Sequence, residues 1–191
     1  MVNPRLISRL VCSLFVVGNL GAQPTSPSRH TITRDLMKGA VAGAVATWVM
    51  GRVTSAMYDR EDRRARRRED AARQGKTAYG VAAEKAARAV GSRLGDDQRE
   101  KVGSAIHWAL GIGAGAVYAV LRRRFNAVGR TAGFGFGTAF WAAIDEGLVP
   151  ALGLTKGPAA FPWQTHARGL AGHVSFGAVA DGTLRVLDAV V

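Results

Sequence analysis

The strongest constraint in this sequence is a run of 20 residues, Val102 to Leu121, that contains no Lys, Arg, Asp or Glu. Three consecutive arginines, Arg122, Arg123 and Arg124, follow it directly. About 20 apolar residues in a helix match the thickness of the hydrocarbon core of a bilayer, and basic residues commonly flank such a helix. The run therefore predicts a membrane-spanning helix, and it makes lipid the expected solvent for much of the chain.

The charged residues are concentrated in one segment. Residues 59–101 hold 13 of the 26 Lys and Arg and 9 of the 14 Asp and Glu, so the mean hydropathy of +0.04 averages a charged segment with apolar ones. Within the segment, Gly75 separates a polar stretch from a weakly amphipathic one, Thr77 to Leu94. We expect an arginine-rich helical hairpin that lies on the membrane surface, on the rest of the protein or in solvent.

Three further stretches are poor in charge and are candidate spans: residues 36–58, 131–153 and 169–187. The first has 13 uncharged residues between Lys38 and Arg52, which is short of about 20, but both side chains can reach opposite interfaces and extend the span. Pro150 should kink or end the second. The expected fold is an all-α integral membrane helix bundle of four spans over residues 31–191, with the polar hairpin between the first two.

The N-terminal segment, residues 1–30, has the layout of an export signal. Arg5 and Arg9 precede an apolar stretch, residues 10–20, and small and polar residues follow it. Leu20 occupies a position near the possible cleavage point that prefers a small side chain. The segment is therefore a cleaved signal, an uncleaved anchor that adds a fifth span, or an extension upstream of the true start.

Glycines four residues apart occur in three of the candidate spans. Small residues at this spacing clear one face of a helix and let another backbone approach, which is how helices associate where lipid offers no hydrophobic driving force. In a soluble helix each such glycine would cost about 1 kcal/mol relative to alanine. We therefore expect helix packing through Gly39, Gly43, Gly111, Gly115, Gly133 and Gly137. The same faces are equally suited to joining two copies of the chain, so a homo-oligomer is an alternative.

Five ionisable side chains fall inside the candidate spans: His107, Asp145, Glu146, His173 and Asp181. A charge exposed to hydrocarbon costs at least about 2.5 kcal/mol, so these groups should face the interior and should pair or stay neutral. Asp145 and Glu146 are consecutive and should point about 100 degrees apart on a helix. The leading interpretation is that these groups hold the bundle together, with Asp181 pairing to Arg185 four residues on. The alternative is a proton or ion pathway.

A stretch rich in Gly and Pro lies between the last two candidate spans, and it predicts a re-entrant or interfacial loop. The candidate loop residues are Pro158, Pro162, Trp163 and His166, with Trp163 at the level of the lipid headgroups. His166 and His173 are seven apart and can share a helix face. No other His or Cys joins them, and Cys12 is the single cysteine, so neither a metal nor a cofactor is expected.

Motifs of known catalytic mechanisms give no support for an enzyme. The sequence contains no phosphate-binding loop, no Ser-His-Asp arrangement and no HExxH motif. The glycines of GFGFG at residues 133–137 alternate strictly and follow no strand, so they are not a nucleotide fingerprint. We therefore expect a protein that is not an enzyme.

A net charge of +12 makes nucleic acid a candidate partner. Basic residues beside apolar spans are, however, typical of cytoplasmic loops, so the interpretation as a membrane protein is favoured and nucleic acid is not. Anionic lipid is the candidate partner of a basic cluster: Arg63, Arg64, Arg66, Arg67 and Arg68. The weakest alternative is a peripheral protein that uses this cluster to bind nucleic acid or anionic lipid.

The distribution of basic residues favours an orientation with residues 59–101 in the cytoplasm, because most of the basic residues then lie inside. The reverse orientation would place Arg122 to Arg130 inside, and it stays open.

A short motif in the C-terminal half follows a span that contains His107 and Trp108; its positions are Leu154, Thr155, Pro158, Pro162, Trp163, Gly172 and His173. This motif resembles the YagU-like family of bacterial inner-membrane proteins, which has no assigned molecular function. The resemblance extends over residues 36–188. The resemblance implies a small multi-pass protein of the cytoplasmic membrane and implies no activity. The arginine-rich excursion and the N-terminal extension depart from the family's pattern.

These observations predict a multi-pass protein of the bacterial inner membrane, with the lipid bilayer as its main partner and a non-enzymatic structural or stress-related role. The alternative function is a small proton-coupled transporter or channel subunit that uses Asp145, Glu146 and His173.

Overall fold

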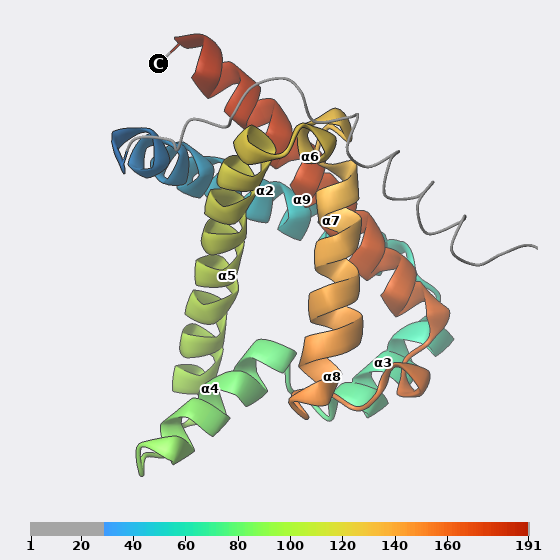
Figure 1. Cartoon of the computed structure of the whole chain (residues 1–191). Helices are drawn as coiled ribbons and strands as arrows, with labels where there is room; N and C mark the ends of the chain where they lie inside the picture. Colours follow the sequence, from blue (N-terminus) through green and yellow to red (C-terminus); the bar gives the residue numbers. More distant parts are fainter. Residues whose placement is uncertain (1–28, 191) are drawn as a thin grey trace, which may run out of the picture.

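The computed structural model describes residues 29–190, and within them every regular element is helical (Figure 1). The expected all-α class is therefore confirmed for this part of the chain. The signal-like segment, residues 1–30, lies almost entirely outside the described residues. The elements are α2 (Arg29–Arg60), α3 (Arg63–Arg73), α4 (Ala78–Ala89), α5 (Asp96–Arg124), α6 (Asn126–Arg130), α7 (Phe134–Trp141), the π-helical η1 (Ala142–Leu148), α8 (Val149–Ala151), the 3-10 helix η2 (Pro158–Ala160) and α9 (Trp163–Val190).

Three long helices form the framework. Helix α2 packs against both α5 and α9, and α7 packs against α9 (Figure 1). Helix α4 lies along the beginning of α5. Helices α3 and α4 lie at one end of the framework with the segment that follows α7, whereas α6 lies at the opposite end. The order of packing is thus α5, α2, α9, α7.

The charged segment forms the two expected helices, α3 and α4, joined by a turn, but α4 packs along α5 and not against α3. Asp62 caps α3, because its carboxylate accepts hydrogen bonds from the backbone N–H groups of Arg64 and Ala65, at 2.8 and 2.9 Å. The chain turns after α3 with Gly75 at a φ of 73°, a left-handed conformation that suits glycine. Thr77 then caps α4. The break predicted at Gly75 therefore corresponds to the turn between two short helices.

Glycines bring α2 into backbone contact with α5. A methyl group added at Gly39 would lie 2.6 Å from the Ala116 Cα atom, and one added at Gly43 would lie 2.5 Å from the Gly111 carbonyl oxygen. A methyl group at Gly115 would overlap the backbone of both Gly39 and Gly43. The four glycines that the sequence singled out on these two helices thus meet one another within one chain.

A second glycine contact joins α7 to α9. A methyl group at Gly133 would overlap the backbone of Gly177, and one at Gly137 would overlap the backbone of His173. Gly133 also has a φ of 82°, which a residue with a side chain rarely adopts. The third predicted glycine pair therefore also lies where two helix backbones meet.

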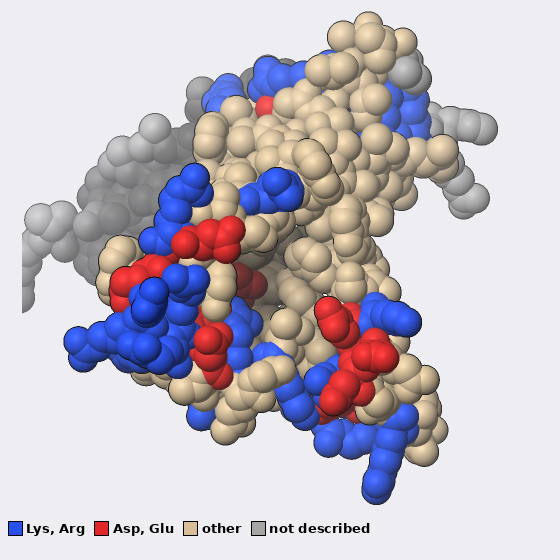
Figure 2. Space-filling view, turned by 180° about the vertical axis from the view of Figure 1, so that it is seen from behind, with Lys and Arg blue, Asp and Glu red and all other residues tan. Residues whose placement is uncertain are grey.

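The interior is built from small side chains, while many large apolar side chains point outward. Ala42, Ala46 and Ala180 are fully buried, and the largest buried apolar side chains are Tyr118 and Phe176. On the outside of α2 lie Leu36, Met37, Val41, Val45 and Trp48. A broad, mostly uncharged surface therefore covers much of the molecule away from the end that holds α3 and α4, which we call the charged end (Figure 2).

Among the described helices, α5 is the one long and apolar enough to cross a membrane by length and composition. Only 22% of its most apolar stretch is buried, unlike the core helix of a soluble protein. The other three candidate spans form helices, but they do not reach the same apolar composition. The structure thus supports one candidate membrane helix, and the expected four-span bundle goes beyond it.

Several boundaries differ from the sequence-based expectation. Lys38 does not extend outward to an interface: its ammonium group is buried and donates to the Leu187 carbonyl and to Asp188, each at 3.0 Å. The third candidate span begins at Phe134 and changes to a π-helix at Ala142. Of the four predicted loop residues, Trp163 and His166 belong to α9, because the helix begins directly after Pro162.

The glycine contact predicts a difference between two neighbouring substitutions in α5. Gly115→Ala should lower the stability by about 1 to 3 kcal/mol, because the new methyl group overlaps the α2 backbone. Gly113→Ala is the matched control, since a methyl group there meets nothing within 4 Å. Thermal unfolding of both variants in the same detergent would measure the effect. Equal unfolding midpoints would contradict the proposed contact.

Candidate functional site

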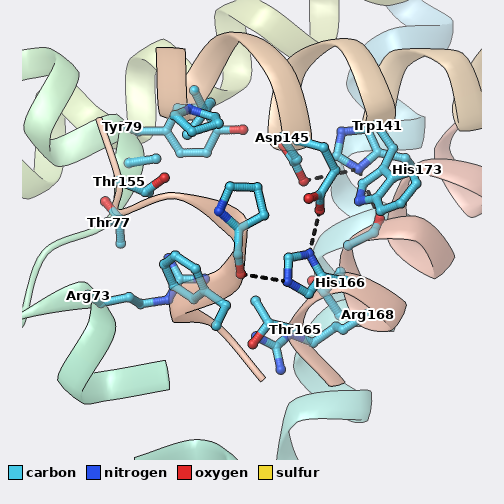
Figure 3. A pocket seen from close by; sticks show the side chains of 18 of the residues that line it. Arg73, Thr77, Tyr79, Trp141, Asp145, Thr155, Thr165, His166, Arg168 and His173 are labelled. Carbon is cyan, nitrogen blue, oxygen red and sulfur yellow. Dashed lines mark hydrogen bonds and ion pairs between the residues drawn. The ribbon is translucent and has the colours of Figure 1, made fainter. Parts of the chain in front are cut away.

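A cavity of about 310 Å³ lies at the charged end of the framework. Its walls come from α2, the end of α3, the beginning of α4, α5, η1 and the beginning of α9, together with the loop before α9 (Figure 3). A hollow between the two groups of charged side chains is visible on this end of the molecule (Figure 2). The cavity gathers five ionisable residues singled out from the sequence: His107, Asp145, Glu146, His166 and His173.

The two consecutive carboxylates, Asp145 and Glu146, both line this cavity. Asp145 and Glu146 lie in the middle of η1, where the helix is wound more loosely than an α-helix. A π-helical segment of this kind changes the direction of the side chains and is frequent at functional sites. Pro150 follows at the beginning of α8, and the helix ends one residue later.

His166 and Glu146 form a close pair at the cavity. The Nδ1 atom of His166 lies 2.6 Å from the Glu146 Oε1 atom, and its Nε2 atom lies 3.1 Å from the Pro158 carbonyl oxygen. A carbonyl and an ionised carboxylate both accept hydrogen bonds, so the imidazole is the donor to both of these groups when both of its nitrogens carry hydrogen. The ring is thus held between one carboxylate and one backbone carbonyl.

His173 is held differently. Its Nδ1 atom donates to the Gly169 carbonyl oxygen at 3.0 Å, and the Asp145 Oδ2 atom lies 3.7 Å away. The imidazole is buried and packs edge-on against the Phe140 ring. Asp145 is thus an ion-pair neighbour of His173 rather than its main hydrogen-bond partner.

Aromatic groups that the sequence did not single out complete the cavity. Tyr79, at the beginning of α4, packs on the His107 ring with 4.8 Å between the ring centres. Burial, with the nearby charge of Asp145, raises the pKa of Tyr79 to about 12, so the phenol keeps its proton. The indole N–H of Trp141 also lines the cavity and is buried with no hydrogen-bond partner.

A buried ion cluster clamps the arginine-rich hairpin to α9 beside the cavity. Arg168 donates to Glu69 at 2.6 Å and to Glu61, and its guanidinium lies 5.0 Å from the centre of the Tyr58 ring. Glu69 is 2% exposed and also accepts from Arg73 at 2.7 Å. Buried charges of this kind require paired partners. The buried link from α3 to α9 is therefore made by the acidic Glu69.

The environment of Glu69 makes this attachment depend on pH. Burial alone would raise the pKa of Glu69, but the hydrogen bond from Arg168 and the charge of Arg73 outweigh it, so the pKa lies below its ordinary value of 4.5. A lowered carboxyl pKa contributes stability that is present above the ordinary value. That contribution is lost as the pH falls through the lowered pKa.

Asp181 lies away from the cavity, near the opposite end of the framework. Its carboxylate accepts from the Tyr118 hydroxyl at 2.8 Å, from Arg122 at 3.1 Å and from Arg185 at 2.6 Å. The pairing with Arg185 follows the four-residue spacing anticipated above. Asp181 thus joins α5 to α9 and is separate from the other four intramembrane candidates.

The predicted loop residues and the basic cluster of α3 do not form a single group. Pro158 contributes its carbonyl to His166, Pro162 is buried at the start of α9, and Trp163 is 73% exposed. In the basic cluster of α3, Arg66 is half-buried over the Tyr58 ring, while the other four arginines are exposed. No group of three or more His, Cys, Asp or Glu suited to a metal ion occurs within residues 29–190.

The sequence profile of a family described as "Protein of unknown function (DUF1440)" matches residues 74–182. The chain belongs to this family. No curated protein and no solved structure matches it. The matched DUF1440 region contains all the cavity residues except Met50, Thr54 and Arg73, so the cavity is built almost wholly from the part of the chain that defines the family. It is therefore the strongest candidate for a functional site.

The buried ion cluster predicts that α3 detaches when Glu69 is removed. Glu69→Ala should cost about 3 to 5 kcal/mol, because it leaves Arg168 buried with one remaining carboxylate partner. Trypsin should then cleave faster within α3, because a helix with six arginines would no longer be held against α9. Glu100→Ala is the control, since Glu100 is exposed on α5. Unchanged cleavage of the Glu69 variant would show that α3 is held by other contacts.

Proposed function

We propose that this DUF1440 protein is a non-enzymatic, multi-pass protein of the bacterial cytoplasmic membrane, with the lipid bilayer as its main partner. The observation that carries the proposal is the placement of large apolar side chains on the outside and of Gly and Ala on the inside. In water this arrangement would expose an extensive apolar surface. In lipid it is favourable, because helices pack there through small residues.

Helix lengths support several spans. Helices α2, α5 and α9 contain 32, 29 and 28 residues, so each exceeds about 40 Å at 1.5 Å per residue and is longer than the roughly 30 Å hydrocarbon core. The charges that lower the apolar character of α2 and α9 include Lys38 and Asp181, which are buried and paired. Inward, paired charges are compatible with a membrane-spanning helix.

The proposed role is structural or stress-related, as implied by the resemblance to YagU-like inner-membrane proteins. The ion cluster at Asp181 supports it, because two arginines and a tyrosine around one carboxylate join α5 to α9. A homo-oligomer and binding of anionic lipid by the exposed arginines of α3 stay as predictions.

Alkaline carbonate extraction tests the membrane proposal. Membranes from cells that produce the full chain should retain the protein in the pellet, because embedded helices resist extraction that removes peripheral proteins. A known peripheral protein in the same preparation is the control. Release of this chain into the supernatant would overturn the membrane proposal.

A second function, proton-coupled transport, is favoured by one specific observation. The His166 imidazole and the Glu146 carboxylate lie 2.6 Å apart at a cavity that also contains Asp145 and His173. Paired histidines and carboxylates in a membrane protein are typical of proton relays. The proposal is that protons enter this cavity. They then either pass to the opposite side of the membrane or are exchanged for a transported substrate.

Reconstituted vesicles with a pH-sensitive dye inside test the transport function. Wild-type protein should accelerate proton flux, and Glu146→Gln and Asp145→Asn should abolish the acceleration, because each removes a group that can bind a proton. Asp97→Asn is the matched control, since Asp97 is exposed in the first turn of α5 and outside the cavity. Wild-type vesicles as proton-tight as empty ones would leave the structural role as the better explanation.

A further inference from the structure

A second cavity, of about 520 Å³, lies at the opposite end of the framework from the histidine cavity. It is formed where the beginning of α2, the end of α5 and the end of α9 come together, beside the first residue of α6. Charged side chains dominate its lining: Arg34, Lys38, Arg122, Arg123, Asp35 and Asp188. Four basic groups thus face two acidic ones, an excess of two positive charges.

The two carboxylates are shared among the basic groups. Asp188 forms ion pairs with Lys38 at 3.0 Å, with Arg122, and with Arg123 at 3.9 Å. Asp35 pairs with Arg123 at 2.7 Å. Nearby positive charges, led by the hydrogen bond from Lys38, outweigh burial and hold the pKa of Asp188 below its ordinary value, so it stays ionised at neutral pH. Arg122 also pairs with Asp181 at 3.1 Å, and Arg185 pairs with the same carboxylate at 2.6 Å, so this wider set of charged groups still has more basic than acidic members.

Hydrogen-bond donors also outnumber acceptors in this cavity. The Lys38 ammonium has three donors and uses two, for the Leu187 carbonyl and for Asp188. Arg122 and Arg123 each offer five more. Arg122 donates to the carboxylate and the backbone carbonyl of Asp181 and to Asp188, and Arg123 pairs with Asp35. A group with several negatively charged oxygens would match this excess, which is how arginines recognise phosphate.

The cavity lies where the apolar stretches of three helices end. The uncharged run of α5 stops at Leu121, directly before Arg122. The uncharged stretch of α2 begins directly after Lys38, and Asp188 follows the last apolar turn of α9. In a membrane-embedded protein, all three transitions fall at the level of the lipid headgroups.

We propose that this cavity binds a phosphate group, and that in the membrane this phosphate belongs to the headgroup of an anionic phospholipid. Basic pockets between membrane helices are suited to such headgroups because they supply both charge and hydrogen-bond donors. The lipid as the source of the phosphate rests on the proposed membrane location, whereas the phosphate chemistry of the cavity does not. The site is distinct from the basic cluster of α3, which lies at the other end.

Native mass spectrometry of the full chain in detergent tests the proposal, with phosphatidylglycerol as the probe. Phosphatidylglycerol should bind more tightly than phosphatidylcholine, and added salt should weaken it. Asn126→Asp should weaken binding about tenfold, because it adds a negative charge to the cavity wall and leaves every ion pair in place. The double variant Arg34→Gln/Arg123→Gln should weaken it at least as much.

A charge-matched control is available in α3. The double variant Arg67→Gln/Arg68→Gln removes the same two charges from exposed positions at the other end, and it should change the affinity less than about twofold. Loss of binding in this control with no loss in the cavity variants would overturn the proposal, and so would equal affinity for both lipids. Inorganic phosphate is a separate arm. Cavity variants that weaken only its binding would establish a phosphate site and overturn the lipid as its source.

Failure of the proposed phosphate site can be distinguished from failure of the proposed membrane location. Carbonate extraction reports membrane insertion without any dependence on the basic cavity, and phosphate binding is measured without a membrane.

Discussion

The backbone contact between α2 and α5 is the constraint on which the rest of this structure depends. Gly39, Gly43 and Gly115 remove the side chains that would keep the two helices apart, so carbonyl groups and Cα atoms of one helix lie against those of the other. Such an interface gains dispersion contacts over a short distance but buries little side-chain volume. Large apolar side chains consequently point outward. This outward placement of apolar side chains is the feature on which the proposed membrane location rests.

Polar chemistry is confined to the two ends of this framework. One end has a cavity with histidines and carboxylates, and the other has a cavity with a positive excess. Aromatic rings lie between them, since Tyr118 packs on Phe136 at 4.8 Å, Phe136 on Phe140, and Phe140 on Phe176. Phenyl rings carry no exchangeable protons. A proton path through this arrangement would therefore need these rings to move.

Two pairs, each of one basic and one acidic side chain, lie beside the first cavity and have different roles. Arg168 and Glu69 attach the charged hairpin to α9, and neither has an obvious chemical task beyond that attachment. His166 and Glu146 are less buried and form a hydrogen-bonded pair at the cavity. The first pair explains how α3 is attached. The second places an imidazole and a carboxylate together in the cavity wall.

The sequence alone determined the features that depend on neighbouring residues. These include the apolar run of α5, the turn at Gly75, the glycine spacing and the pairing of Asp181 with Arg185, because composition and helical periodicity are local properties. Only the tertiary structure decided which distant groups meet. Arg168 and Glu69 are 99 residues apart, and the π-helical winding that turns both Asp145 and Glu146 toward one cavity has no local signature in the sequence. Such contacts follow from how whole helices pack, and the packing is set by many residues together.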